Sequence, residues 1–69
     1  MKRNMTISYD PLWKTMRKRG MTTYELTMKH KFNKGTLYRI QRGKNVNIAT
    51  IAELCEILNC QIEGIVKLK

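Results

Sequence analysis

The sequence is poor in the residues that carry most enzyme and metal chemistry. It contains one histidine, His30, and five acidic residues spread from Asp10 to Glu63. General acid–base catalysis needs such groups in positioned sets, and the sequence offers no evident nucleophile–base pair or carboxylate pair. Cys55, Cys60 and His30 lack the paired ligand spacing of zinc sites. We therefore expect neither an enzyme nor a metal site, and no cofactor or small-molecule ligand.

Cysteines and long apolar runs are also scarce. The two cysteines, Cys55 and Cys60, are five residues apart, and on one helix this spacing would place them on different faces. We expect two buried, reduced thiols, as is usual in a cytoplasmic protein. No run approaches the ~20 apolar residues of a membrane span. The basic residues near the N-terminus are not followed by the apolar core of a signal peptide.

Positive charge is the largest anomaly of the composition. The 69 residues carry a formal net charge of +9, while 42% of them are hydrophobic. These values predict one globular domain, residues 1–69, rather than a disordered chain. Between Glu25 and Glu53 there is no acidic residue. Such an excess favours a polyanionic partner, although a basic run can also be merely a solvated surface.

The first half of the chain predicts a strand and two helices. Residues 5–9 alternate between apolar and polar, which is the period of a strand. Asp10 is expected to cap a first helix with Pro11 at its first position, and Gly20 to end it. Thr22 and Glu25 form a capping box that opens a second helix, which ends near residues 29–30.

The third helix is expected over residues 34–42, with Asn33 as its N-cap and Gly43 at its end. A rotation of 100° per residue places Leu37 and Ile40 together on the buried side. The opposite side carries three cationic residues, one aromatic residue and one glycine: Lys34, Gly35, Tyr38, Arg39 and Arg42. Thr36 lies at the flank.

A fourth helix is expected to begin after Asn47 and to end at Asn59 in a left-handed turn. Its broad apolar face comprises Ile51, Ala52, Leu54, Cys55 and Leu58. Residues 60–65 can form one short helical turn, and residues 65–69 alternate like a strand.

This arrangement resembles the helix-turn-helix family of phage repressors and Cro, also called the xenobiotic-response-element family. The matching stretches are MTTYEL at residues 21–26 and FNKGTLYRIQRG at residues 32–43, followed by the apolar helix. The resemblance covers about residues 7–66, which it implies as the core of the domain. It implies an all-α bundle of about five helices, with the third helix as the recognition helix in the major groove. It implies a sequence-specific regulator of transcription that binds double-stranded DNA and acts as a repressor.

The resemblance also implies the residues that contact DNA. Lys34 and Arg39 can donate to guanine, whereas Arg42 and Lys44, near the helix end, are expected on phosphates. The full set is Thr22, Thr23, Asn33, Lys34, Gly35, Thr36, Tyr38, Arg39, Arg42 and Lys44. One recognition helix reads few base pairs, so we expect a homodimer, with the two strand-like segments pairing within or between chains.

The sequence departs from the family pattern at the turn between the second and third helices. Lys31 stands where the family has a glycine, and Thr27 replaces a small residue. A positive φ at this position costs a lysine on the order of 1–2 kcal/mol. An alternative function also stays open, because antitoxins and anti-repressors share this fold and would use the same surface to bind a protein.

Overall fold

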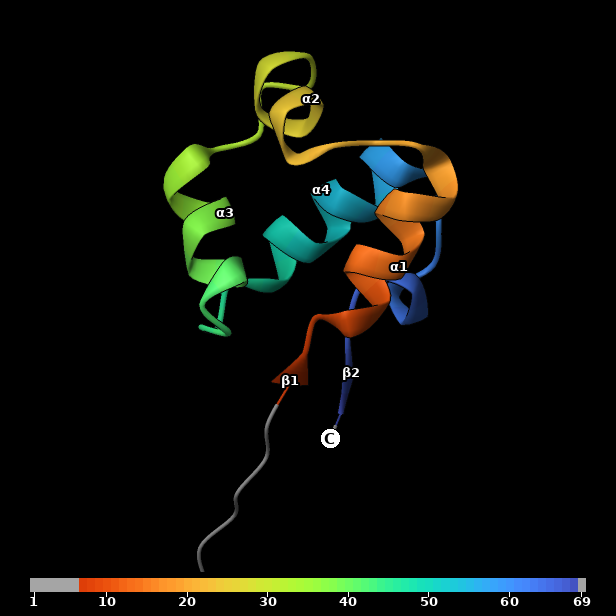
Figure 1. Ribbon diagram of the computed structural model, residues 1–69. Helices are drawn as coiled ribbons and strands as arrows, with labels where there is room; N and C mark the ends of the chain where they lie inside the picture. The colour runs from red at the N-terminus through yellow and green to blue at the C-terminus, as the bar shows by residue number, and fades with distance from the viewer. Residues whose placement is uncertain (1–6, 69) are drawn as a thin grey trace, which may run out of the picture.

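Four α-helices surround a shared apolar core in the computed structural model, which describes residues 7–68 (Figure 1). The helices are α1 (Asp10–Arg19), α2 (Thr23–Met28), α3 (Lys34–Gln41) and α4 (Ile48–Leu58). A 3-10 turn, η1 (Ile62–Gly64), follows α4. In Figure 1, α4 lies between α1 and α3, so these two helices occupy opposite sides of the molecule. The predicted all-α helix-turn-helix bundle is therefore confirmed.

The core takes residues from all four α-helices and from Ile65, which follows η1. The largest fully buried side chains are Leu12, Leu26, Ile40, Leu54, Leu58 and Ile65. Trp13 is half-buried and packs against this cluster. Ala52 is exposed, so its predicted place on the apolar face of α4 is wrong. In α4 the buried side is the narrower stripe of Ile51, Leu54 and Leu58.

Side chains cap three of the four α-helices, as the sequence predicts. Thr22 and Glu25 form the complete capping box of α2. The Oδ1 atom of Asn33 accepts a hydrogen bond from the Thr36 N–H at 2.8 Å, and Asn47 does the same for the Thr50 N–H at 2.9 Å. Each cap satisfies a backbone donor that the helix itself leaves unpaired.

The start of α1 differs from the prediction by one residue. Asp10 is the first helical residue rather than the N-cap, and Pro11 is the second. Tyr9 takes the cap position because its side chain is buried in the core, and its carbonyl accepts the Leu12 N–H at 2.9 Å. The Asp10 N–H instead donates to the Ser8 hydroxyl at 3.2 Å.

Three helices end in the same two-bond motif, with a left-handed residue just past the last turn. These residues are Gly20 (φ 66°), Gly43 (φ 74°) and Asn59 (φ 52°). After each, the chain turns back and donates an N–H to the carbonyl five residues earlier: Met21 to Met16, Lys44 to Arg39 and Cys60 to Cys55. This is the Schellman motif, in which side chains at the two bonded residues are neighbours.

The cysteine positions follow from this ending. Because α4 ends at Leu58, Cys60 lies outside the helix and returns toward Cys55. The expectation that the two cysteines lie on different faces of one helix is therefore wrong. Both residues are free thiols and are half-buried rather than fully buried.

Two short strands join the ends of the described chain. β1 (Ile7–Ser8) and β2 (Lys67–Leu68) pair antiparallel, with Ile7 opposite Leu68 and Ser8 opposite Lys67. The predicted strands thus pair within one chain. Residues 5, 6 and 69, which the sequence analysis included in these strands, lie outside the described residues.

The turn between α2 and α3 contains the lysine that departs from the family pattern. Lys31 has a φ of 58°. The left-handed region brings Cβ close to the following carbonyl, so a lysine is strained there while a glycine is not. The positive φ expected at this turn is confirmed, and the chain retains it despite the lysine.

We predict that Lys31→Gly raises the free energy of unfolding by about 1 kcal/mol, because relief of the strain outweighs the added freedom of the unfolded chain. Lys29→Gly is a matched control, because Lys29 has a φ of −83° and is not strained. It should lower stability instead. Urea unfolding of both variants measures the difference, and a less stable Lys31→Gly variant would contradict the prediction.

Candidate nucleic-acid interface

The α2–turn–α3 unit is fixed to the core by its turn. Phe32 is only 3% exposed, and its N–H donates to the Leu26 carbonyl at 3.1 Å. Leu26 on α2 and Leu37 and Ile40 on α3 are buried in the same cluster. Phe32 is thus an apolar plug that fixes the turn between α2 and α3 to the core.

The outward face of α3 is cationic. Lys34, Gly35, Tyr38 and Arg39 are exposed, and Thr36 is half-buried at the flank. Arg42, just past the helix, is exposed as well. The structure thus brings the predicted residues of α3 onto one surface, opposite the buried Leu37 and Ile40.

Tyr38 and Arg42 form a stacked pair on this surface. An Nη of Arg42 donates to the Tyr38 hydroxyl at 2.8 Å, and its guanidinium carbon lies 5.2 Å from the ring centroid. The two residues are four apart, the spacing at which helical side chains meet. A cation over an aromatic face is attracted by the ring quadrupole. The pair therefore presents one combined surface, with the remaining guanidinium donors outward.

Arg39 is bound to the loop that follows α3. One of its Nη atoms donates to the Asn45 carbonyl at 2.9 Å. The same loop is held from the other side, where the Tyr9 hydroxyl donates to the Lys44 carbonyl at 2.6 Å. Burial raises the pKa of Tyr9, and the nearby positive charge of Arg39 partly offsets this. Sequence reasoning missed both bonds, because each joins residues whose proximity only the folded chain creates.

Arg39 keeps most of its hydrogen-bonding capacity. An arginine has five N–H donors, and a single bond to Asn45 leaves the others available. The bond also restrains a side chain that otherwise loses considerable rotamer freedom on binding. Arg39 is thus a partly pre-ordered donor on the outward face of α3.

Gly35 leaves room for the N-cap of its own helix. A Cβ at residue 35 would lie 3.1 Å from the Asn33 Oδ1 atom that caps α3. That separation is tighter than an ordinary van der Waals contact, so a larger residue would press on the cap. The cap thus gives this position a structural reason for glycine.

The N-terminus of α2 carries two exposed threonines. The Thr22 hydroxyl accepts the Glu25 N–H at 3.1 Å, so it is occupied by the capping box. Thr23 is exposed at the first helical position. Tyr24, which follows, is 71% exposed and was not singled out from the sequence. Helical periodicity places Tyr24 away from the Leu26 side of α2, and this was the sequence signal that could have identified it as exposed.

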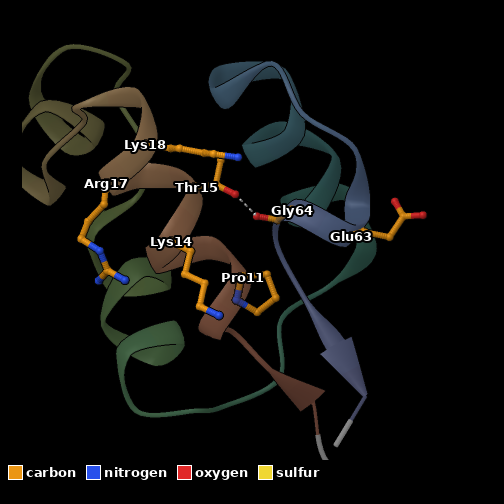
Figure 2. A pocket seen from close by; sticks show the side chains of 7 residues that line it. All are labelled: Pro11, Lys14, Thr15, Arg17, Lys18, Glu63 and Gly64. Atoms are coloured by element: carbon orange, nitrogen blue, oxygen red, sulfur yellow. Dashed lines mark hydrogen bonds between the residues drawn. The ribbon is translucent and has the colours of Figure 1, made fainter.

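A second cationic region lies on α1, away from α3. Figure 2 shows Lys14, Arg17 and Lys18 around a shallow hollow between α1 and η1. The Thr15 hydroxyl donates to the Gly64 carbonyl at 2.7 Å and fixes the two elements to each other. Glu63 lines the same hollow and partly balances its charge. By contrast, the stretch that contains α3 and its flanking loops has no acidic residue between Glu25 and Glu53.

A family model, the Cro/C1-type helix-turn-helix DNA-binding domain, matches residues 11–69. The chain belongs to the Cro/C1-type family. The match includes α2, the turn and α3, the unit whose outward face is cationic. The family resemblance inferred from the sequence is therefore confirmed.

This Cro/C1-type domain is also similar to a solved structure. The crystal structure of the transcriptional regulator VanUg, form II, is 29% identical to it, with a TM-score of 0.88. The similarity covers 99% of this chain and 91% of that one. No curated protein matches the chain. Within residues 7–68, no helix is long and apolar enough to cross a membrane.

The cap of α3 predicts that the effects of substitutions at Asn33 and Gly35 on stability are coupled. Gly35→Ala alone should change stability little, because the gain in helix propensity, about 1 kcal/mol, is offset by the clash with the Asn33 Oδ1 atom. In an Asn33→Ala background, which removes that atom, Gly35→Ala should stabilise by the full amount. Chemical unfolding of the double-mutant cycle measures the coupling.

Asn47→Ala provides the control, because it removes an equivalent cap from α4. Each asparagine variant should lose about 1 kcal/mol by itself. In the Asn47→Ala background, Gly35→Ala should change the free energy of unfolding by no more than it does in the wild-type chain. An equal change in the wild-type, Asn33→Ala and Asn47→Ala backgrounds would show that the cap does not constrain residue 35.

Proposed function

We propose that the protein is a sequence-specific regulator of transcription that binds double-stranded DNA through α3 in the major groove and acts as a repressor. The observation that carries this proposal is the exposed cationic face of α3 on a Cro/C1-type helix-turn-helix unit. An α-helix fits the major groove, where base edges display a distinct pattern of donors and acceptors. A domain that occupies this groove in a promoter excludes other proteins from it, which favours repression.

Base reading is assigned to the side chains at the middle and start of α3. Arg39 and Lys34 can donate to the O6 and N7 atoms of guanine. Thr36 lies half-buried beside them, and Gly35 leaves the backbone open to close approach. The bond from Arg39 to Asn45 supports the role of Arg39, because a restrained guanidinium loses less freedom on binding.

Phosphate binding is assigned to the residues that flank α3. Thr22 and Thr23 mark the N-terminus of α2, where backbone N–H groups point outward toward an anion. The amide group of Asn33 and the cations of Arg42 and Lys44 surround the two ends of α3. Tyr38, stacked with Arg42, adds a hydroxyl donor or packs on a thymine methyl. Together these contacts set the position of α3 on the duplex.

The proposed function is tested by the salt dependence and sequence dependence of binding. Sites are first selected from random duplexes, and affinity is then measured at several salt concentrations. The logarithm of the affinity should fall linearly with the logarithm of the salt concentration, with a slope of several units, because bound phosphates release counterions. A slope near zero, with binding to an acidic protein retained, would favour the protein-interaction alternative.

Variants of two cations separate base reading from phosphate binding. Arg39→Ala should lose most of the preference for the selected site, about 1–3 kcal/mol of discrimination. Arg39→Lys keeps the charge but not the planar fork, and it should lose preference while retaining affinity for random DNA. Lys44→Ala should weaken binding to both duplexes equally and make the salt slope shallower by about one unit. Equal weakening of both duplexes by Arg39→Ala would make Arg39 a phosphate contact.

We also propose that the protein binds DNA as a homodimer. The proposed contact is an apolar hollow on the strands and η1, lined by Ile7, Ile62, Val66 and Leu68. Leu68 is 66% exposed and Ile62 is 45% exposed, so the hollow leaves considerable apolar surface in water. Glu63 and Lys67 flank it. Two-fold symmetry lets the glutamate of one copy meet the lysine of the other.

The distribution of charge supports a second copy as the partner. From residue 45 onward the sequence has three glutamates and two lysines, while twelve of the fourteen basic residues precede it. The hollow therefore lies on the nearly neutral part of a strongly basic chain. Two copies can meet there without bringing their cationic surfaces together, which reduces the repulsion that the net charge imposes.

We predict that Leu68→Asp abolishes the dimer, because each partner would then bury an unpaired carboxylate. Ile48→Asp is the matched control, since Ile48 is 72% exposed and lies outside the hollow. Sedimentation, free and on the selected duplex, measures the assembly state, and circular dichroism checks that both variants fold. A wild-type chain that stays monomeric in both conditions would exclude the dimer.

A further inference from the structure

The end of α4 brings the two cysteines together. Asn59 adopts a left-handed conformation, and its N–H donates to the Glu56 carbonyl at 3.3 Å. The Cys60 N–H then donates to the Cys55 carbonyl at 3.0 Å. These are the two bonds of a Schellman motif, which places the side chains of its first and last residues in contact. In this chain those residues are Cys55 and Cys60.

Covalent geometry limits the separation of the two residues. With the Cys60 N and the Cys55 O hydrogen-bonded, standard bond lengths keep the two Cα atoms within roughly 7 Å of each other. Bond angles reduce this upper limit further. Disulfides usually join Cα atoms about 4.4–6.8 Å apart. The folded backbone therefore keeps the two Cα atoms within the range that a disulfide accepts.

The surroundings of the pair leave both cysteines half-buried. The Cys60 Sγ lies against Gly64, where an added Cβ would come within 3.2 Å of it. On its other side Gly64 is held by the Thr15 hydroxyl, as Figure 2 shows. Cys55 borders a shallow apolar hollow with Ile62 and the outer side of α4.

We propose that Cys55 and Cys60 form a dithiol modification site that a small hydroperoxide oxidises to an intramolecular disulfide. One thiolate attacks a peroxide oxygen, the O–O bond breaks, and the sulfur becomes a sulfenic acid. The second thiol, as its thiolate, attacks that sulfur, the S–S bond forms, and hydroxide leaves and takes up a proton. In total, two thiols and one hydrogen peroxide give one disulfide and two water molecules. The sulfurs are oxidised and the peroxide oxygens are reduced.

The local chemistry makes this a site of limited intrinsic reactivity. Burial raises the pKa of the Cys55 thiol, and the neighbouring Cys60 and Glu63 raise it further. Cys55 is therefore protonated at neutral pH, and the thiolate is the reactive form. What the fold supplies is proximity, which makes the second step intramolecular and faster than attack by water or by another chain. The site is independent of the proposed binding of DNA.

The experiment treats the full chain with excess hydrogen peroxide, followed by an alkylating reagent. Intact mass should show the loss of two hydrogens and no alkylation, and dithiothreitol should restore both thiols. The product should run as a monomer on a non-reducing gel, with a rate that does not depend on protein concentration. The yield of the intramolecular disulfide, relative to sulfinic and sulfonic acids, should be several-fold higher for the native chain than for the same chain unfolded in urea, because the fold accelerates the second step. Intermolecular disulfides, two alkylated thiols after peroxide, or equal yields for native and unfolded chains would overturn the proposal.

Two substitutions at the cap test whether the motif positions the thiols. Asn59→Gly preserves the left-handed conformation and should keep the native yield of disulfide relative to over-oxidised thiols. Asn59→Val disfavours that conformation, because a β-branched residue is strongly strained at positive φ, and it should lower this yield several-fold. Cys60→Ser removes the second thiol and should stop at the sulfenic acid or a more oxidised form of Cys55. Equal yields for Asn59→Gly and Asn59→Val would also overturn the proposal.

Discussion

The hydrogen bond from the Phe32 N–H to the Leu26 carbonyl, at 3.1 Å, closes the turn on which the position of α3 depends. It holds only if Lys31 accepts a positive φ and Phe32 inserts into the core. Burial of Phe32 offsets the strain at Lys31, since a fully buried aromatic ring contributes roughly 1.5–3 kcal/mol against a strain of 1–2 kcal/mol. The chain thus keeps the helix-turn-helix geometry without the usual turn glycine.

The end of α3 also positions the loop that follows it. The left-handed Gly43 reverses the chain, so that the Lys44 N–H donates to the Arg39 carbonyl. The Arg39 guanidinium in turn donates to the Asn45 carbonyl in this loop. Tyr9 reaches the same loop from the start of α1. The loop after the cationic helix is therefore held by the first and third helical regions at once. A restrained loop keeps Arg39 oriented before any partner is bound.

The cationic surface of α3 was largely predictable from the sequence. Helical periodicity separates Leu37 and Ile40 from Lys34, Tyr38 and Arg39, and the structure buries the first pair and exposes the others. The caps at Thr22, Asn33 and Asn47 were also predictable, because an N-cap depends on residues only three positions apart. The proposed contact of these residues with DNA is supported by membership of the Cro/C1-type family.

The sequence by itself determined the features that depend on near neighbours: the order of the helices, their caps, the left-handed ends at Gly20 and Asn59, and the sign of the charge on α3. Only the tertiary structure decided which distant groups meet. Burial of Tyr9 shifted the start of α1 by one residue. Tertiary packing also left Ala52 exposed, brought the Tyr9 hydroxyl to the Lys44 carbonyl, and paired β1 with β2. The cysteines show both contributions. The left-handed turn at Asn59, which the sequence predicts, reverses the chain after α4 and makes Cys60 a neighbour of Cys55. Tertiary packing decided their surroundings, because it places Cys60 against Gly64 and Cys55 beside Ile62.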